Sequence, residues 1–183
     1  MNMLPKSAYV HIPFCHRRCF YCDFAVIPLG NKVEALQGYG SKTVKEYLNF
    51  LYKEILSIKH KSPLSTIYVG GGTPSILDPK QIKELIDLFK ENYGIDYGAE
   101  ITMEVDPASF NQDDLHGFIN AGINRFSLGV QSFNNEILQR SGRRHFKEDA
   151  EKSCIWLKRG YDSGLIKSWS LDLIQNLPLS GLR

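Results

Sequence analysis

The sequence predicts an α/β protein built on a parallel β-sheet. Short apolar or alternating runs, typical of strands, alternate along the chain with longer segments whose apolar residues recur every three or four positions, as in helices. Each connection between successive strands is long enough for a crossover helix, so we expect parallel strands joined by right-handed βαβ units. Either an open doubly wound sheet or a partial barrel satisfies this order.

In chain order, residues 7–12 (SAYVHI) form the first predicted strand, and a cysteine-rich loop follows it. The first predicted helix covers residues 41–59, has Ser41 as its N-cap, and carries apolar side chains at Val44, Leu48, Leu51, Ile55 and Ile58. Residues 66–69 form a buried strand that ends in three glycines. The pair Asp78-Pro79 then supplies an N-cap and a proline at the first helical position, which opens a helix over 80–92.

The second part of the chain repeats this alternation. Residues 100–105 alternate between apolar and polar side chains, which predicts a strand, and the helix over 112–121 is stopped by Gly122. The last two strands and the helix between them are predicted at residues 125–130, 169–174 and 146–159.

Composition excludes several classes of protein. Lys plus Arg number 22 and Asp plus Glu number 20, and the net charge of +2 gives no support for nucleic-acid binding. No apolar run approaches the roughly 20 residues of a membrane-spanning helix, and strand-like sequence from residue 8 leaves no room for a signal peptide. We expect one globular domain in the cytoplasm, or in an organelle matrix if a longer N-terminus exists.

Special residues follow or end each predicted strand. Three cysteines follow the first strand and three glycines the second, Glu104 ends the third, Gln131 follows the fourth, and Asp172 lies in the fifth. Ligands of such proteins bind at the carboxyl ends of the parallel strands. The pattern therefore predicts a ligand site at this edge of the sheet.

Cys15, Cys19 and Cys22 form a C-x3-C-x2-C motif in one short loop. Thiolates bind iron–sulfur clusters or zinc, and three of them would leave one iron of a [4Fe-4S] cluster open to a small molecule. The basic residues His16, Arg17 and Arg18 between these cysteines are expected to favour the thiolate forms.

Other interpretations of the same residues stay open at this point. The three cysteines could be ordinary buried residues, or a zinc site completed by His11 or His16. Cys154, which lies beside Ile155 and Leu157, is expected to be a core residue. Taken alone, the glycines are more typical of a tight turn, and Glu104 of a solvated carboxylate at a strand end.

Residues 9–24, YVHIPFCHRRCFYCDF, resemble the signature of the radical S-adenosylmethionine (SAM) superfamily, and more narrowly of its anaerobic coproporphyrinogen III oxidase-like branch. Further motifs follow in the family order: GGGTPS at 70–75, EVDP at 104–107, RFSLGVQSF at 125–133, GRRH at 142–145 and LDLI at 171–174. The resemblance implies a radical SAM core domain, an incomplete TIM-type barrel.

The resemblance also implies the cofactors. The three cysteines would hold three irons of a [4Fe-4S] cluster, and the amino and carboxyl groups of SAM would chelate the fourth. Reduction of the cluster by an electron donor would then cleave SAM to methionine and a 5′-deoxyadenosyl radical. The residues that match the family's SAM contacts are Tyr9, Tyr21, Gly71, Gly72, Thr73, Glu104, Gln131, Arg143 (with Arg144 as an adjacent alternative) and Asp172.

Two functional classes share this signature. The oxidase branch decarboxylates propionates of coproporphyrinogen III and has a further cysteine two residues after the third, where this chain has Phe24. The Cys-Asp-Phe form resembles the heme chaperones known as HemW, which bind heme and pass it to respiratory proteins. A heme chaperone-like protein is therefore favoured, which would bind heme and pass it to a heme-accepting partner; an oxidase and a structural zinc protein without SAM are the alternatives.

The family pattern continues after residues 171–174 into a further helix, a further strand and a separate C-terminal region, whereas this chain ends at residue 183. We therefore expect residues 1–183 to be a radical SAM core domain truncated after its fifth strand. An inactive truncated form is a third functional alternative.

Overall fold

The computed structural model describes residues 4–30, 39–58 and 62–177. Five strands form the main sheet: β1 (Ser7–Ile12), β4 (Leu64–Gly71), β5 (Ile95–Val105), β6 (Arg125–Gln131) and β7 (Ser168–Leu173). The longer helices are α1 (Tyr39–Ser57), α2 (Pro79–Asn92), α3 (Gln112–Asn120) and α5 (Lys147–Asp162). Shorter elements are β2 (Phe14–Cys15), β3 (Ile27–Pro28), the 3-10 helix η2 (Pro74–Ile76) and α4 (Asn135–Arg140).

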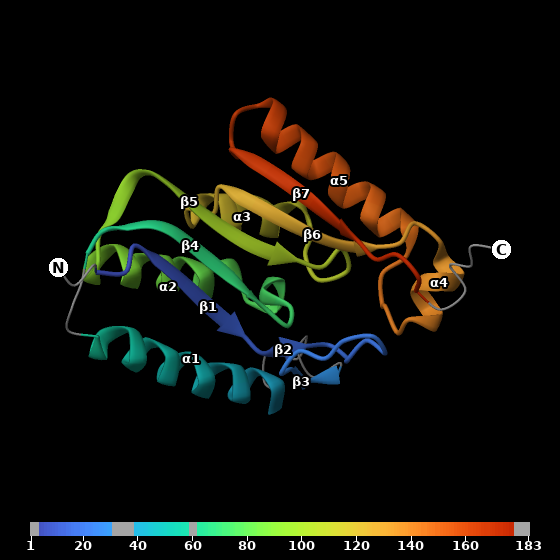
Figure 1. Cartoon of the computed structure of the whole chain (residues 1–183), viewed down its shortest axis with the longest axis horizontal. Coiled ribbons are helices and arrows are strands. Elements are labelled where there is room, and N and C mark those ends of the chain that lie inside the picture. The colour runs from blue at the N-terminus through green and yellow to red at the C-terminus, as the bar shows by residue number, and fades with distance from the viewer. Residues whose placement is uncertain (1–3, 31–38, 59–61, 178–183) are drawn as a thin grey trace.

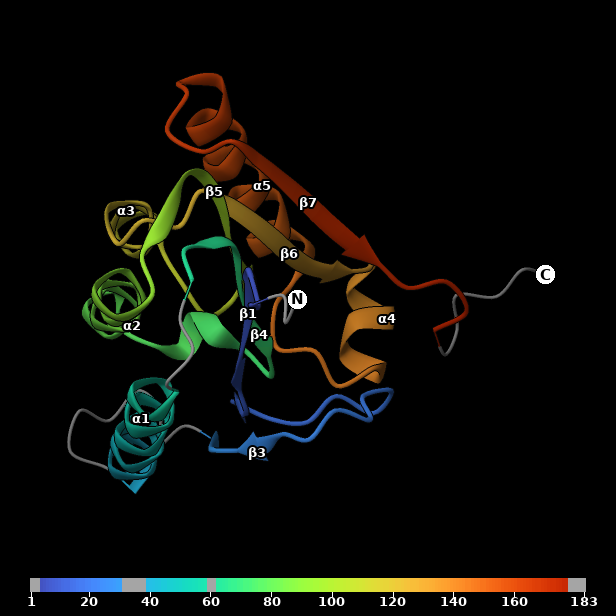
Figure 2. The same ribbon diagram turned by 60° about the vertical axis from the view of Figure 1, so that its left-hand side comes forward.

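The main sheet is parallel throughout, in the order β1-β4-β5-β6-β7, which confirms the predicted βα units. These strands are neighbours in their order along the chain, without the reversal that marks a doubly wound sheet. The helices α1, α2 and α3 line up along one side of the strands, and α5 continues this layer behind β6 and β7 (Figures 1 and 2). Of the two predicted architectures, the partial barrel is the correct one.

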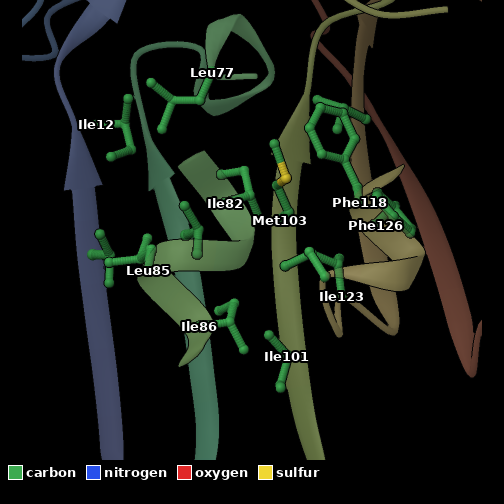
Figure 3. Close-up of a cluster of buried hydrophobic side chains, with 14 of the residues drawn as sticks. Ile12, Leu77, Ile82, Leu85, Ile86, Ile101, Met103, Phe118, Ile123 and Phe126 are labelled. Carbon is green, nitrogen blue, oxygen red and sulfur yellow. The ribbon is translucent and has the colours of Figure 1, made fainter. Parts of the chain in front are cut away.

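The hydrophobic core fills the space between the sheet and the helix layer. Met103 of β5 is fully buried there, and side chains from α2 and α3, among them Ile82 and Phe118, surround it (Figure 3). The opposite face of the sheet is polar because strand side chains alternate between the two faces. On that face Thr102 of β5 pairs with Arg125 of β6, and Ser127 of β6 pairs with Ser170 of β7.

Most predicted boundaries agree with the structure to within a few residues. Asp78 caps α2 as expected, and a reciprocal bond with Gln81 completes its capping box. The prediction of Ser41 as an N-cap is wrong, because α1 already begins at Tyr39 and Ser41 lies inside its first turn. Cys154 packs against the core as predicted.

Several short elements were absent from the prediction. The two-residue strands β2 and β3 pair Phe14 with Ile27 and Cys15 with Pro28, and they frame the cysteine loop. Helix α4 begins after Asn134, whose side chain caps it. Within the part of the chain that the structure describes, no helix is both long and apolar enough to cross a membrane.

Candidate functional site

A cavity of about 270 Å³ lies at the carboxyl ends of the strands. Predicted site residues from six separate parts of the chain line it: Cys15, Tyr21, Cys22, Gly71, Gly72, Thr73, Glu104, Gln131, Arg143 and Asp172. Of the predicted residues, Tyr9 and Cys19 do not line this cavity. The fold therefore brings together the special residues that follow successive strands.

The loop that carries the cysteines is held by backbone bonds to distant segments. Within the loop, the Cys22 N–H donates to the Cys19 carbonyl at 3.1 Å. The Leu29 N–H donates to the Cys15 carbonyl at 2.8 Å, and the Phe20 N–H donates to the carbonyl of Ser141 at 3.0 Å. The loop is thus fixed at both ends and in its middle.

No three His, Cys, Asp or Glu side chains in residues 4–30, 39–58 and 62–177 lie close enough to share one metal ion. A cubane cluster does not require its ligands to meet at one metal ion, because each thiolate binds a different iron. The three cysteines can therefore serve a cluster without converging on a single position.

Two basic residues of the loop, Arg17 and Arg18, donate hydrogen bonds to backbone carbonyls. Arg17 donates to the backbone carbonyl of Arg143, and Arg18 donates from Nε to the carbonyl of Cys22 at 2.9 Å. Burial raises the pKa of the Cys15 thiol, although a hydrogen bond from the Thr73 hydroxyl at 3.5 Å opposes the change. The expectation that the neighbouring basic residues favour the thiolate forms stays a prediction.

At the end of β4, glycine is required by the backbone conformation and by contacts within the protein. Gly71 has a φ of +117°, a conformation that residues with a Cβ rarely adopt. A Cβ on Gly72 would lie 2.6 Å from the Phe14 carbonyl oxygen and 2.9 Å from the Cys15 sulfur. The Gly72 N–H donates to the Ile12 carbonyl at 2.8 Å. These glycines therefore allow the end of β4 to pack directly on the cysteine loop.

Glu104 is held in place at the end of β5. One carboxylate oxygen accepts the Tyr68 hydroxyl at 2.8 Å, and the other accepts the Gly71 N–H at 3.1 Å. Burial raises the pKa of the Tyr68 phenol, and the hydrogen bond to Glu104 and the negative charge of that carboxylate raise it further. The carboxylate is thus oriented by its neighbours and is not merely a solvated group at a strand end.

Gln131 and Asp172 reach the cavity from the last two strands. Gln131 has a φ of +65°, which is uncommon for a residue other than glycine, and it lies at an irregularity in the pairing of β6 with β7. Such local strain is often found at functional sites. Asp172 accepts a hydrogen bond from the Ser127 hydroxyl at 3.1 Å.

Arg143 is the only arginine that lines this cavity in the described part of the chain. Its side chain is 12% exposed and donates to the Asp106 carboxylate, to the Gly129 carbonyl at 2.6 Å and to the Cys19 sulfur at 3.8 Å. Burial alone would lower the pKa of Arg143, but the Asp106 carboxylate raises it, so the guanidinium stays charged. The adjacent Arg144 does not line this cavity but lines a smaller neighbouring one.

The two tyrosines predicted as SAM contacts lie in different places. Tyr21 lines the main cavity, and burial raises the pKa of its phenol. Tyr9 is 61% exposed, stacks on Tyr68 with ring centroids 5.9 Å apart, and lines a separate cavity of about 340 Å³ between β1 and α1. The structure does not bring Tyr9 into the main cavity, so its contact with SAM stays a prediction.

The donor set of the cavity fits a zwitterionic, ribose-bearing ligand beside a cluster. The carboxylates of Glu104 and Asp172 can accept hydrogen bonds from an amino group or from ribose hydroxyls. The buried Nε of Arg143 has no hydrogen-bond partner in the described residues, and a carboxylate is its natural acceptor. The residues present therefore fit SAM and a cluster with one open iron.

Sequence reasoning gave no role to several residues of the cavity wall: Val26, Pro74, Val105, Asp106, Ser127 and Gly129. Ser127 and Gly129 occupy alternate positions of β6, on the face that Asp172 shares across the sheet. Their period of two along the strand is a signal that could have identified them.

The sequence profile of the Radical SAM superfamily matches residues 9–166. A protein named heme chaperone HemW from Synechocystis is 41% identical to this chain, over 96% of the chain and 41% of the relative. An oxygen-independent coproporphyrinogen III oxidase from Salmonella typhimurium is 37% identical, over 95% of the chain and 36% of the relative.

Among solved structures, the coproporphyrinogen III oxidase HemN from Escherichia coli, described as a radical SAM enzyme, superposes with a TM-score of 0.77. It is 34% identical in sequence, and the match covers 94% of this chain and 37% of that protein. The chain thus spans less than half the length of each of these relatives.

Proposed function

Because the chain belongs to the radical SAM superfamily, whose members use a [4Fe-4S] cluster and SAM, we propose that Cys15, Cys19 and Cys22 bind the cluster and that the adjoining cavity binds SAM. The observation that carries this proposal is the convergence of the cysteine loop with Glu104 and Arg143 at one end of the sheet. Bound there, the cluster would supply one-electron reduction of SAM.

Each polar residue of the cavity has a role in this proposal. Glu104, oriented by Tyr68 and Gly71, accepts a hydrogen bond from the SAM amino group, and the Arg143 guanidinium donates to the SAM carboxylate. Asp172 accepts from the ribose hydroxyls. The loop at residues 71–73 covers the methionine part of SAM, and Tyr21 closes the wall beside Cys22.

For the function as a whole, we propose a heme chaperone-like protein. Phe24 supports this, because it lines the cavity at the position where the oxidase branch is expected to have a further cysteine. The name of the Synechocystis relative agrees with it. The second candidate is an oxygen-independent coproporphyrinogen III oxidase, which the likeness to the solved HemN structure supports.

This proposal implies further partners. An electron donor would reduce the cluster, and a heme-accepting protein would receive heme. The expected cytoplasmic location, and the expectation that residues 1–183 represent a truncated core domain, stay predictions. Since the relatives are more than twice as long as their matched part, a test of heme transfer should include a version extended by a relative's remaining sequence.

The cysteine assignment is tested by anaerobic reconstitution of the purified chain. Replacing Cys15, Cys19 or Cys22 with alanine should remove the charge-transfer absorption of the cluster together with bound iron and sulfide. The matched control is Cys154→Ala, which should keep them because Cys154 packs against the core. Equal loss in the control would disprove the assignment, and zinc without sulfide in the wild type would favour a zinc protein.

The two functional classes differ in the tetrapyrrole that they use. The reconstituted chain is incubated with heme and, separately, with coproporphyrinogen III, SAM and a reductant. Uptake of heme without consumption of coproporphyrinogen supports the chaperone. Decarboxylation of coproporphyrinogen would instead establish the oxidase.

A further inference from the structure

Asp106 lies directly after β5 and lines the cavity wall, yet neither the motifs nor the proposed ligand contacts give it a role. Its carboxylate Oδ2 accepts a hydrogen bond from Nη2 of Arg143. The two side chains are 20% and 12% exposed, so this ion pair is largely shielded from water. Shielding strengthens the pair relative to one on the surface.

The carboxylate of Asp106 is itself fixed by the turn in which it lies. Its Oδ1 accepts the Ala108 N–H at 3.0 Å, and its backbone N–H donates to the hydroxyl of the buried Ser75, also at 3.0 Å. Oδ2 is therefore directed at Arg143 by contacts that do not involve the cavity. A rigid acceptor of this kind can orient a long and flexible side chain.

His145 is the other basic group beside Asp106, with its Nδ1 4.0 Å from Oδ2. This ring is buried and its Nε2 faces the Val130 carbonyl at 3.0 Å, which fixes the proton on Nε2. Burial also lowers the pKa of His145. The neutral ring does not compete with Arg143 for the carboxylate.

Arg143 lies where three parts of the fold meet. Its Nη2 also donates to the Gly129 carbonyl of β6, and its Nη1 donates to the sulfur of Cys19 in the cysteine loop. Its backbone carbonyl accepts from Arg17 of the same loop. The orientation of the guanidinium therefore decides which of its N–H groups face the cysteine loop and which face the cavity.

We infer that Asp106 is a positioning residue: it holds the guanidinium of Arg143 between Cys19 and the cavity, so that this cation is presented to the carboxylate of SAM. This inference rests on the proposed SAM site. In this arrangement Asp106 acts on SAM through Arg143 and not as a hydrogen-bond partner of SAM or a ligand of the cluster. Without its charge, the guanidinium loses its anionic partner and adopts other orientations.

The test uses Asp106→Asn in the reconstituted chain, because asparagine keeps an oxygen for the Ala108 N–H and removes only the charge. SAM affinity measured by calorimetry should fall about tenfold, the effect typical of losing a charge-assisted contact, while iron and sulfide content stay at the wild-type level. The matched control is Asp87→Asn, which removes an exposed carboxylate paired with Lys83 on α2 and should leave SAM affinity unchanged.

Repeating the Asp106→Asn change in an Arg143→Gln variant separates a role in positioning Arg143 from a purely structural role. In Arg143→Gln, the further change Asp106→Asn should alter SAM affinity less than twofold, because its effect is exerted through Arg143. A lower melting temperature with unchanged SAM affinity would overturn the inference, since Asp106 would then only stabilise the fold. An equal loss of SAM affinity on Asp106→Asn in the wild type and in Arg143→Gln would also overturn the inference.

A measurement on the wild type keeps the inference falsifiable if Asp106→Asn does not fold. The NMR signal of the Arg143 Nε–H, assigned by its absence in Arg143→Gln, should shift when SAM is added to the reconstituted chain. No shift despite SAM binding would overturn the inference alone. Cluster assembly without any SAM binding would overturn the proposed SAM site and the inference with it.

Discussion

Replacing Gly72 with alanine tests how closely the end of β4 must approach the cysteine loop. The added Cβ would lie 2.6 Å from the Phe14 carbonyl oxygen and 2.9 Å from the Cys15 sulfur. The φ of Gly72 is outside the left-handed region, so the change adds atoms without adding backbone strain. Its effect therefore measures the contact itself.

The magnitude follows from the distance that must be recovered. Ordinary contacts begin at 3.4 Å, so the carbonyl and the Cβ must separate by 3.4 − 2.6 = 0.8 Å. The Thr73 N–H donates to the same carbonyl at 2.7 Å, so this movement also strains a hydrogen bond of the loop. Overpacking of this kind costs about 1–3 kcal/mol, and we expect Gly72→Ala to lower the free energy of unfolding by that amount.

Gly160→Ala is the matched control, and its expected sign is opposite. Gly160 lies in α5, where the nearest atoms to an added Cβ belong to the Ile166 side chain at 3.7 Å. Alanine is favoured over glycine inside a helix by about 0.5–1 kcal/mol, so this variant should be more stable than the wild type.

The assay is urea denaturation of the cluster-free chain, followed by circular dichroism, with iron and sulfide measured after reconstitution. Gly72→Ala should lose stability and bind less iron because the loop that carries Cys15 is displaced. Unchanged unfolding free energy together with full cluster content would refute the reasoning.

Three further changes test other parts of the argument. Asp172→Asn should raise the Kd for SAM by about tenfold or more while cluster content is kept, since a charge-assisted contact is lost; calorimetry measures the change, and unchanged affinity would make Asp172 structural. Met103→Ala should lower the free energy of unfolding by about 2–5 kcal/mol in urea titrations, because Met103 is fully buried and its truncation leaves a cavity in the core; a loss below about 1 kcal/mol would contradict this packing. Burial lowers the pKa of His145, so on acidification the imidazole takes up a proton in the unfolded chain before it does so in the folded chain. The contribution of His145 to stability is therefore present above a pH of about 6.5 and is lost as the pH falls toward the folded-state pKa. His145→Gln should therefore reduce the loss of stability between pH 7.5 and pH 5.5, and an unchanged pH profile would show that His145 does not titrate in this way.

The sequence by itself determined the main strands and helices and their order along the chain. Apolar periodicity and local caps such as Asp78 depend on neighbouring residues, and these signals are present in the linear chain. The carboxyl ends of parallel strands meet at one edge, so the order of strands also predicted that Glu104, Gln131 and Asp172 lie near the cysteines. The resemblance of the motifs added the identity of the cofactors.

Only the tertiary structure decided which side chains face the cavity and what holds them there. Arg143 lines the cavity and Arg144 does not, although the two are adjacent and identical in type. The partnership of Asp106 with Arg143 spans 37 positions, and the contact that requires Gly72 is made with Phe14, far away in the chain. Such contacts depend on the direction of each side chain after the strands have packed, and local sequence periodicity does not contain that information.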